Sequence, residues 1–393
     1  MTHIGLAAYP KRIMKNKILC GDSLEVLKDF EDNYFDSVVT DPPYGLAFMG
    51  KKWDYDVPEV ELWKEVYRVL KPGGHILSFA GSRTYHRMAV NIEDAGFEIR
   101  DMLGWLYGSG FPKSHNIGKA VDKIQGNKRE VIGVSTGKGY SSQQEKNKEQ
   151  GFRPYKDGLP HEKADRTLTK GNSEWEGWGT ALKPAHEPIV MARKPFNTSV
   201  AENVLTHGTG GINIDECRVG TELIKTQGGQ KFKGDGIYNK YKDCKESTHE
   251  GRFPANIIHD GSEEVLEVFQ ESSRFFYCAK ASKAERNMGL DDFEKKEPPG
   301  SKRSKPAPGR KSALGQPRAN HHPTVKPIKL MEYLVRLVTP KEGIVLEPFA
   351  GSGTTLIACK QQGFNYIGIE REQEYCDIAE ARLKAVQVQG ELF

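Results

Sequence analysis

A rigid group of hydrogen-bond acceptors and one aromatic ring is encoded by Asp41-Pro42-Pro43-Tyr44. This tetrapeptide directly follows Asp36–Thr40, whose β-branched residues predict a strand. Each proline fixes its own φ angle and restricts the residue before it, so the segment is stiff. A carboxylate, free carbonyls and a ring in one patch can accept hydrogen bonds from an –NH₂ group and stack on a flat ring. The alternative is a strand-ending turn with a solvated Asp41 and a packed Tyr44.

A glycine-containing loop near the end of the chain predicts a second binding element. The run Ile344–Leu346 predicts a strand, Phe349-Ala350-Gly351-Ser352-Gly353 a turn, and the residues after it a helix. Glu370 ends the next predicted strand, 17 residues past Gly353, where a carboxylate can accept both ribose hydroxyls of a nucleoside. The spacing matches neither a dinucleotide fingerprint nor a P-loop. The alternative is a tight strand–helix turn.

Strands and helices alternate at both ends of the chain, and these elements must position the two motifs. Early in the sequence, the apolar face of Pro58–Leu70 predicts a helix and His75–Ala80 a strand. Late in the sequence, Ile328–Val338 predicts a helix and Asn365–Ile369 a strand. Such alternation predicts an α/β fold with a doubly wound, mostly parallel sheet. Ligands of these sheets bind at the carboxyl ends of strands, which is where both motifs fall.

The middle of the chain has a different composition. Residues 133–183 contain only five Val, Ile, Leu, Met or Phe residues, which predicts a flexible polar insertion. The stretch 292–320 is charged and rich in proline, which predicts a linker. We therefore divide the chain into a catalytic half at 1–110, the insertion at 111–184, a returning strand at 185–196, an irregular recognition region with the basic linker at 197–320, and a cofactor half at 321–393.

Charge, cysteine content and hydropathy narrow the classes of protein. The 57 Lys and Arg residues exceed the 53 Asp and Glu residues by four, which is too small an excess to indicate nucleic acid alone. The six cysteines are dispersed without a C-x-x-C pair, which favours reduced thiols in a cytoplasm over disulfides or a metal site. No apolar run is long enough to span a membrane, and a secretory signal is not expected.

The combination of D-P-P-Y with F-x-G-x-G resembles the amino-methyltransferases that methylate exocyclic amines of DNA bases from S-adenosylmethionine. D-P-P-Y comes first and the glycine loop last, which is the circularly permuted β-group order. Further similarity lies in Gly21-Asp22, Trp105-Leu106-Tyr107, Ala185-His186-Glu187 and His322-Pro323-Thr324-Val325-Lys326-Pro327. The resemblance spans about Ile18–Leu106, Lys183–Lys194 and His321–Ala385. It implies a Rossmann-like, class I methyltransferase fold.

The resemblance also implies roles for individual residues. Asp41 and the Pro42 carbonyl accept hydrogen bonds from the target amine, Pro43 stiffens the segment, and Tyr44 stacks on the base. Cofactor binding is implied for Asp22 at the adenine amine, Thr324 and Lys326 near the methionine moiety, Glu370 at the ribose, and Glu347, Phe349, Gly351, Ser352 and Gly353 in the loop. His186 and Trp105 are expected to flank the pocket. No metal is implied.

These roles predict an enzyme that methylates the N6 amine of adenine in duplex DNA after base flipping. Acceptors at Asp41 and Pro42 localise the lone pair of the amine as its nitrogen becomes tetrahedral, so positioning and electrostatics dominate. No cysteine follows a proline, which argues against C5-cytosine methylation. N4-cytosine methylation remains the nearest alternative, because Asp in the first D-P-P-Y position favours adenine but does not exclude cytosine. Methylation of RNA or protein, or DNA binding without catalysis, are further alternatives.

Partners follow from the same resemblance. Duplex DNA is the expected partner, and Arg303, Lys305, Arg310, Lys311 and Arg318 are candidates for phosphate contacts, with a solvated tail as the alternative. A homodimer and a restriction endonuclease partner are compatible with such an enzyme. Its expected location is the cytoplasm, with action at the nucleoid, for a bacterial or phage-encoded enzyme. Because the cofactor half is C-terminal, we expect one continuous sheet built from both ends. In it the Ile344 strand lies between the Asn365 and Val38 strands, with the Ile18 strand beyond the Asn365 strand.

Overall fold

The computed structural model describes residues 14–46, 55–108, 110, 114–135, 166–226, 247–269, 276–296 and 318–386. The chain divides into two compact units. The larger unit combines Met1–Gly108 with Ala185–Phe393, and the smaller one is Ser109–Pro184. Within the described residues, no helix has the length and apolar character needed to cross a membrane.

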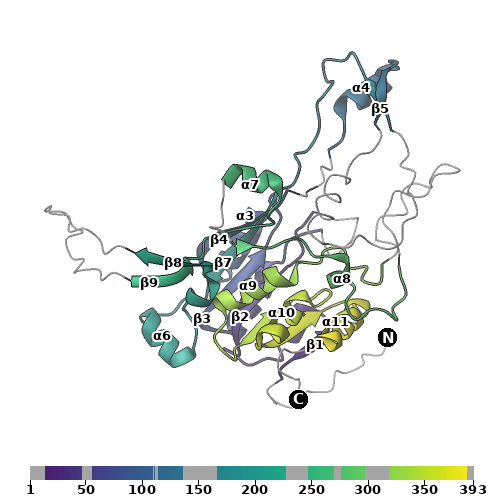
Figure 1. Ribbon diagram of the computed structural model, residues 1–393. Coiled ribbons are helices and arrows are strands. Elements are labelled where there is room, and N and C mark those ends of the chain that lie inside the picture. Colours follow the sequence, from purple (N-terminus) through teal and green to yellow (C-terminus); the bar gives the residue numbers. More distant parts are fainter. Residues whose placement is uncertain are drawn as a thin grey trace, which may run out of the picture. The chain divides into compact units, whose positions relative to one another are not determined.

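A nine-stranded sheet forms the centre of the larger unit (Figure 1), in the order β1-β13-β12-β2-β3-β7-β4-β10-β11. All pairings are parallel except those of β7, which runs antiparallel to both of its neighbours. The predicted doubly wound, mostly parallel sheet is confirmed, as is the predicted order of its first four strands. The strands are β1 Lys17–Cys20, β13 Asn365–Glu370, β12 Ile344–Glu347, β2 Phe35–Thr40, β3 Leu70–Phe79, β7 His186–Arg193, β4 Glu98–Leu106, β10 Ile257–His259 and β11 Phe276–Tyr277.

The two ends of the chain meet at the β2–β12 pair, where Val345 aligns with Ser37. The buried Asp36 carboxylate accepts a hydrogen bond from the Ile344 N–H at 2.7 Å. The Ser37 and Thr339 hydroxyls form a buried hydrogen bond of 2.8 Å. Polar groups inside a core are stable only when they are paired, so these bonds favour this particular register.

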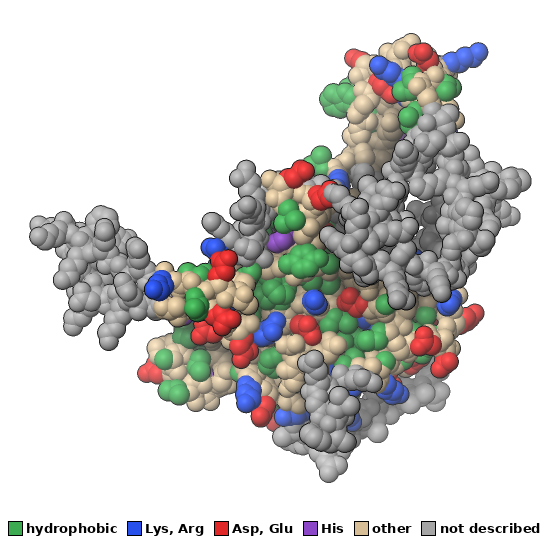
Figure 2. Space-filling view, viewed as in Figure 1, with side chains coloured by type: hydrophobic (Ala, Val, Ile, Leu, Met, Phe, Trp, Pro, Cys, Tyr) green, Lys and Arg blue, Asp and Glu red, His purple; other side chains and the backbone are tan. Residues whose placement is uncertain are grey.

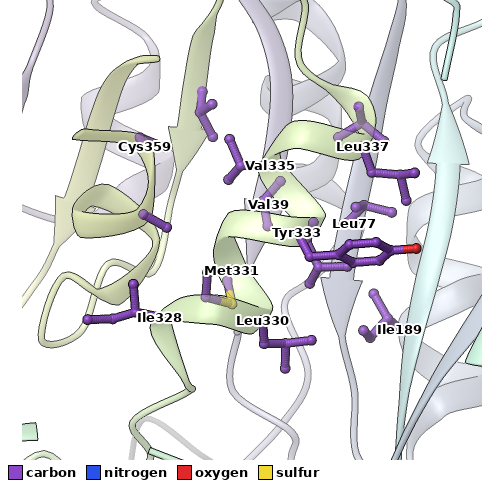
Figure 3. Close-up of a cluster of buried hydrophobic side chains, with 14 of the residues drawn as sticks. Val39, Leu77, Ile189, Ile328, Leu330, Met331, Tyr333, Val335, Leu337 and Cys359 are labelled. Atoms are coloured by element: carbon purple, nitrogen blue, oxygen red, sulfur yellow. The ribbon is translucent and has the colours of Figure 1, made fainter. Parts of the chain in front are cut away.

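Helices cover both faces of the sheet, because successive strand residues point to opposite sides. Val39 and Leu77 belong to the cluster that includes α9 and α10, whereas Val38 belongs to the cluster that includes α2 and α3. Figure 3 shows side chains of α9 lying against Val39 and Leu77. The helices of this unit are α1 Ser23–Leu27, α2 Val60–Val69, α3 Tyr85–Asp94, α6 Val200–His207, α7 Glu263–Phe269, α8 Lys283–Arg286, α9 Ile328–Val338, α10 Thr354–Gln362 and α11 Gln373–Ala385.

The recognition region at 197–320 contributes to the main sheet, which the sequence analysis did not predict. β10 pairs with β4, and β11 pairs with β10, so the sheet continues past the catalytic half. A separate hairpin of β8 (Val219–Thr226) and β9 (Ser247–Arg252) lies outside the sheet. The aromatic run Arg274–Ala279 predicts a strand, and β11 lies within it, but so short a run does not show which strand it pairs with.

The smaller unit contains regular structure where the sequence predicted a flexible insertion. α4 (Ile117–Gln125) is followed by β5 (Glu130–Ser135), which pairs antiparallel with β6 (Arg166–Lys170). The Arg129 guanidinium contacts the Asp122 carboxylate and lies 2.7 Å from the Glu176 carboxylate. The described residues of the insertion therefore form regular structure, and its flexibility stays a prediction. Polar contacts organise them, and a count of aliphatic residues does not detect such contacts.

We predict that truncating the core side chain of α9 destabilises the larger unit. Leu334 is fully buried, so Leu334→Ala should lower the free energy of unfolding by about 2–5 kcal/mol. Leu205→Ala makes the same chemical change on α6 at 88% exposure and should cost less than about 0.5 kcal/mol. Urea unfolding followed by tryptophan fluorescence measures both variants. Equal effects would contradict the placement of α9 in the core.

Candidate active site

Asp41 and Tyr44 lie at the carboxyl end of β2, near the middle of the sheet. The Tyr44 hydroxyl donates to Oδ1 of Asp41 at 2.7 Å, and the Thr84 hydroxyl donates to the Tyr44 carbonyl at 2.6 Å. Pro42, which follows Asp41 in the chain, is buried. These contacts hold the carboxylate and the aromatic ring in one small patch, as the sequence predicted.

The Lys326 ammonium lies against this patch, although its residue is far away in the sequence. Its Nζ is 2.5 Å from Oδ1 of Asp41 and 3.0 Å from the Tyr44 hydroxyl. A second carboxylate, Oε2 of Glu187, is 3.4 Å from the same Nζ. The Phe79 ring lies on another side, with its centroid 4.5 Å from Nζ. The ammonium is therefore enclosed by two carboxylates, a hydroxyl and a ring.

Burial and charge act in opposite directions on this ammonium. Burial lowers the pKa of Lys326, but attraction to Asp41 and then to Glu187 outweighs it, so its pKa is raised above the ordinary value. Burial and the Asp41 charge also raise the pKa of Tyr44 well above its usual range. Lys326 is consequently a cation and Tyr44 a neutral hydrogen-bond donor at neutral pH.

Glu187 is a site residue that the sequence analysis did not select. It lies near the start of β7, which runs antiparallel between β3 and β4. Its carboxylate also lies 3.4 Å from the Tyr44 hydroxyl. A charged residue directly before the apolar run Pro188–Ala192 was the available signal. Antiparallel insertion of the strand is what brings this carboxylate to the carboxyl ends of its parallel neighbours.

The glycine loop lies between β12 and α10, next to the His322 ring. A Cβ atom on Gly351 would lie 2.9 Å from Nε2 of His322, and Gly351 has a φ angle of +52°. Gly353 has a φ angle of +79°, and a Cβ there would lie 2.9 Å from the Ala379 side chain. Burial lowers the pKa of His322 to about 4, so its ring is uncharged. Both glycines are thus required by close approach and by backbone conformation.

Glu370 is joined to this loop by hydrogen bonds. Its carboxylate accepts from the Gly351 N–H at 2.8 Å and from the Glu372 N–H at 2.9 Å. Burial raises the pKa of Glu370, and these backbone bonds oppose the rise. Each carboxylate oxygen keeps a further lone pair that can accept from a ligand hydroxyl. This donor and acceptor set fits the ribose of a nucleoside cofactor.

Glu347 lies at the base of the loop and is almost completely buried. Its Oε2 accepts from the Thr355 hydroxyl at 2.6 Å, and its Oε1 accepts from the Phe349 N–H at 3.1 Å and from the Thr40 hydroxyl. Burial raises the pKa of Glu347 to about 8. The neighbouring Ser352 carbonyl accepts from the buried Arg382 guanidinium at 2.5 Å. Polar side chains from four elements, β2, β12, α10 and α11, therefore fix the loop.

The structure brings most of the predicted site residues to one pocket. Its lining includes Asp41, Thr324, Lys326, Glu347, Phe349, Gly351 and Ser352. Tyr44 and Glu370 contact this lining without belonging to it. Asp22 caps α1 through a 3.0 Å bond from the Leu24 N–H. Its neighbour Ser23 donates to the Pro348 carbonyl at 2.5 Å, which connects that helix to the loop.

Other residues were expected to flank the pocket or to contact DNA, and the outcome differs from one residue to the next. Trp105 is buried, donates to the Cys278 carbonyl at 3.3 Å and is absent from the pocket lining, so it is a core residue. His186 is also absent from that lining. Arg303, Lys305, Arg310 and Lys311 lie outside the described residues, whereas Arg318 is described. In the described part of the chain, no cluster of three or more His, Cys, Asp or Glu residues is arranged to hold a metal.

Comparison with known proteins identifies the family. The family model described as DNA methylase, for N6 and N4 methyltransferases, matches residues 35–381, so the chain belongs to this family. The type II methyltransferase M.HindIII of Haemophilus influenzae is 24% identical, over 87% of this chain and 74% of that protein. M.HpaI of Haemophilus parainfluenzae is 23% identical, over 94% and 74%. The cytosine-N4-specific PvuII DNA methyltransferase is 15% identical, covers 96% and 87%, and has a TM-score of 0.45.

Membership of this family confirms the class predicted from the D-P-P-Y and glycine-loop motifs. The protein is an S-adenosylmethionine-dependent DNA methyltransferase that acts on an exocyclic N6 or N4 amine. The glycines whose Cβ atoms would clash and the hydrogen-bonded Glu370 carboxylate fit this cofactor. The Asp41–Tyr44 patch lies beside the same loop, because β2 and β12 are neighbours in the sheet.

We predict that Glu347 makes stability depend on pH. With a pKa of about 8 in the folded protein and an ordinary value of 4.5, the folded state binds the extra proton between these limits. The free energy of unfolding should therefore fall as pH rises from about 5 to about 8. Glu347→Gln is neutral in both states and should remove this component of the fall. Urea unfolding at several pH values tests this, and parallel curves for the two proteins would contradict it.

Proposed function

We propose that the protein transfers a methyl group from S-adenosylmethionine to the N6 amine of adenine in duplex DNA. The observation that carries this proposal is the shared pocket of Asp41 and the glycine-loop residues. An acceptor for an amine and a cradle for a nucleoside cofactor are both needed for direct transfer, and here they line one cavity. The type II methyltransferase relatives support a role in restriction–modification. A restriction endonuclease partner and a cytoplasmic location are part of this proposal.

The choice of adenine rests on Asp41. In the resemblance described above, Asp in the first D-P-P-Y position favours adenine, whereas the cytosine group more often has Ser. N4-cytosine methylation is the second candidate, since the amine chemistry is the same. A paired base hides its amine in the duplex, so the target must be flipped, and Tyr44 is the ring proposed to stack on it.

When bound, S-adenosylmethionine supplies an electrophilic methyl group in the pocket. The residues of this chain prepare the amine: Asp41 and the Pro42 carbonyl accept its N–H bonds and localise its lone pair. The amine loses one proton as the methyl group is added, and a carboxylate beside it can receive that proton. Asp41 is the carboxylate proposed for the contact, with Glu187 3.4 Å from the Tyr44 hydroxyl.

Lys326 complicates this role of Asp41, because its ammonium contacts the same Oδ1 atom that accepts from Tyr44. We propose that the target amine displaces the ammonium, which then pairs with Glu187. That carboxylate is 3.4 Å from Nζ, so a small movement of the side chain is sufficient. Leaving a buried ammonium without a partner is costly, and a second carboxylate avoids this cost. Glu187 is thus a positioning residue.

The first test concerns Asp41 and the product. Wild-type protein should produce N6-methyladenine in duplex DNA, detected by nucleoside mass spectrometry. Asp41→Ala should lower turnover by about 10²- to 10³-fold, because one transition-state hydrogen bond is lost. It should still bind S-adenosylmethionine in calorimetry, whereas Glu370→Ala should lose affinity for the cofactor and serves as the reciprocal control. Full turnover by Asp41→Ala would overturn the mechanism, and N4-methylcytosine as sole product would overturn the base assignment.

A double-mutant cycle tests the exchange of partners by Lys326. Glu187→Gln should slow single-turnover methyl transfer by roughly 10-fold, which corresponds to a rise of about 1.4 kcal/mol in the activation free energy. In a Lys326→Met background no ammonium occupies Asp41, so adding Glu187→Gln should change the rate less than about 2-fold. Cofactor affinity, measured for each protein, controls for damage to the pocket. The same rate loss in both backgrounds would show that Glu187 acts independently of Lys326.

A further inference from the structure

A second cavity of about 300 Å³ lies in the larger unit, and its charge is unbalanced. Four basic residues line it, together with a single acidic residue, Asp291. The basic residues are Lys283, Arg286, Lys295 and Arg318. On the face of the sheet and its helices in Figure 2, by contrast, acidic and basic side chains are interspersed.

The basic side chains of this cavity are not neutralised by the described part of the chain. None of the four forms an ion pair there. Arg286 is partly buried, and its Nε has no hydrogen-bond partner. Its NH2 donates to the His322 carbonyl at 3.3 Å. Burial and then repulsion by Arg318 lower the pKa of Arg286. The cavity therefore has hydrogen-bond donors and positive charge in excess.

The adjacent acid, Glu285, is already committed to other partners. Its Oε1 accepts from the Ile328 N–H at 2.5 Å, and its carboxylate completes a capping box with Ser282. The Glu285 carbonyl accepts from Arg382 at 3.2 Å, which ties α8 to α11 beside it (Figure 1). These contacts fix α8, whose Lys283 and Arg286 line the cavity.

We propose that this basic cavity binds a backbone phosphate of the DNA substrate, close to the target nucleotide. Guanidinium groups bind phosphate oxygens through paired N–H bonds, and lysines add charge. The position supports DNA over a free anion, since one hydrogen bond connects a residue of this cavity, Arg286, to His322 of the cofactor pocket. The His322 carbonyl accepts this bond. The proposal rests on DNA as the substrate and is independent of which base is methylated.

Salt dependence of DNA binding tests this inference. The affinity of the full chain for duplex DNA is measured between 50 and 200 mM salt, with the slope of log K against log salt as readout. Each phosphate contact contributes about −0.9 to this slope. The double variant Lys295→Gln with Arg318→Gln should reduce its magnitude by about 1. Lys28→Gln with Lys384→Gln removes the same charge from exposed positions just after α1 and on α11, and should leave the slope unchanged.

Two further arms separate the possible explanations. A duplex with one neutral methylphosphonate near the target base should bind wild-type protein more weakly, but should affect the cavity variant little. At saturating DNA, the single-turnover methylation rate of the cavity variant should stay within about 2-fold of the wild-type rate. A failure of the proposed methyl transfer would therefore be seen in this rate, and a failure of the phosphate site in the salt slope. An unchanged slope, or an equal change in the control variant, would overturn the proposal. Binding of inorganic phosphate that the cavity variant loses, with no effect of that phosphate on DNA affinity beyond that of chloride at equal ionic strength, would also overturn it, in favour of a free-anion site.

Discussion

The contact of the Lys326 ammonium with Asp41 is the interaction on which the site depends. It joins a residue at the end of β2 to one just before α9, although 285 positions separate them (326 − 41). The contact is possible because β12 lies directly beside β2, and because buried bonds from Asp36 to Ile344 and from Ser37 to Thr339 fix the adjoining segments. The permuted order of the motifs is therefore compatible with this fold, because strands that are neighbours in the sheet need not be neighbours in the chain.

The same arrangement explains why charged groups can be buried here. The Lys326 side chain is 9% exposed and stays protonated because two carboxylates face it. Glu347 is deeper, has no cation opposite it among its described partners, and has a raised pKa instead. Burial thus produces opposite outcomes depending on whether a counter-charge is present. The pocket therefore contains the Lys326–Asp41 ion pair where the amine is expected, and Glu347, with its raised pKa, beneath the cofactor loop.

Sequence reasoning predicted the parts of the protein that depend on local pattern. The strand before D-P-P-Y, the glycine loop and the helix at Ile328–Val338 all have strong periodicity or fixed turn chemistry, and the motif order predicted the strand order. Glu187 was missed because its role depends on β7 running antiparallel. The contact between Lys326 and Asp41 was missed for a similar reason, since no spacing encodes it. The regular structure of the smaller unit was not predicted, because Arg129 contacts carboxylates there and a count of aliphatic residues does not detect such contacts.

Displacement of Lys326 from Asp41 by the target amine can be observed in a crystal structure of the ternary complex. The complex would contain the protein, a non-reactive analogue of S-adenosylmethionine and duplex DNA that includes the methylated site. We expect an adenine amine within hydrogen-bond distance of Asp41, with Nζ of Lys326 moved from Asp41 to Glu187. A flipped base with Lys326 still on Oδ1 of Asp41 and the amine bound elsewhere would contradict it.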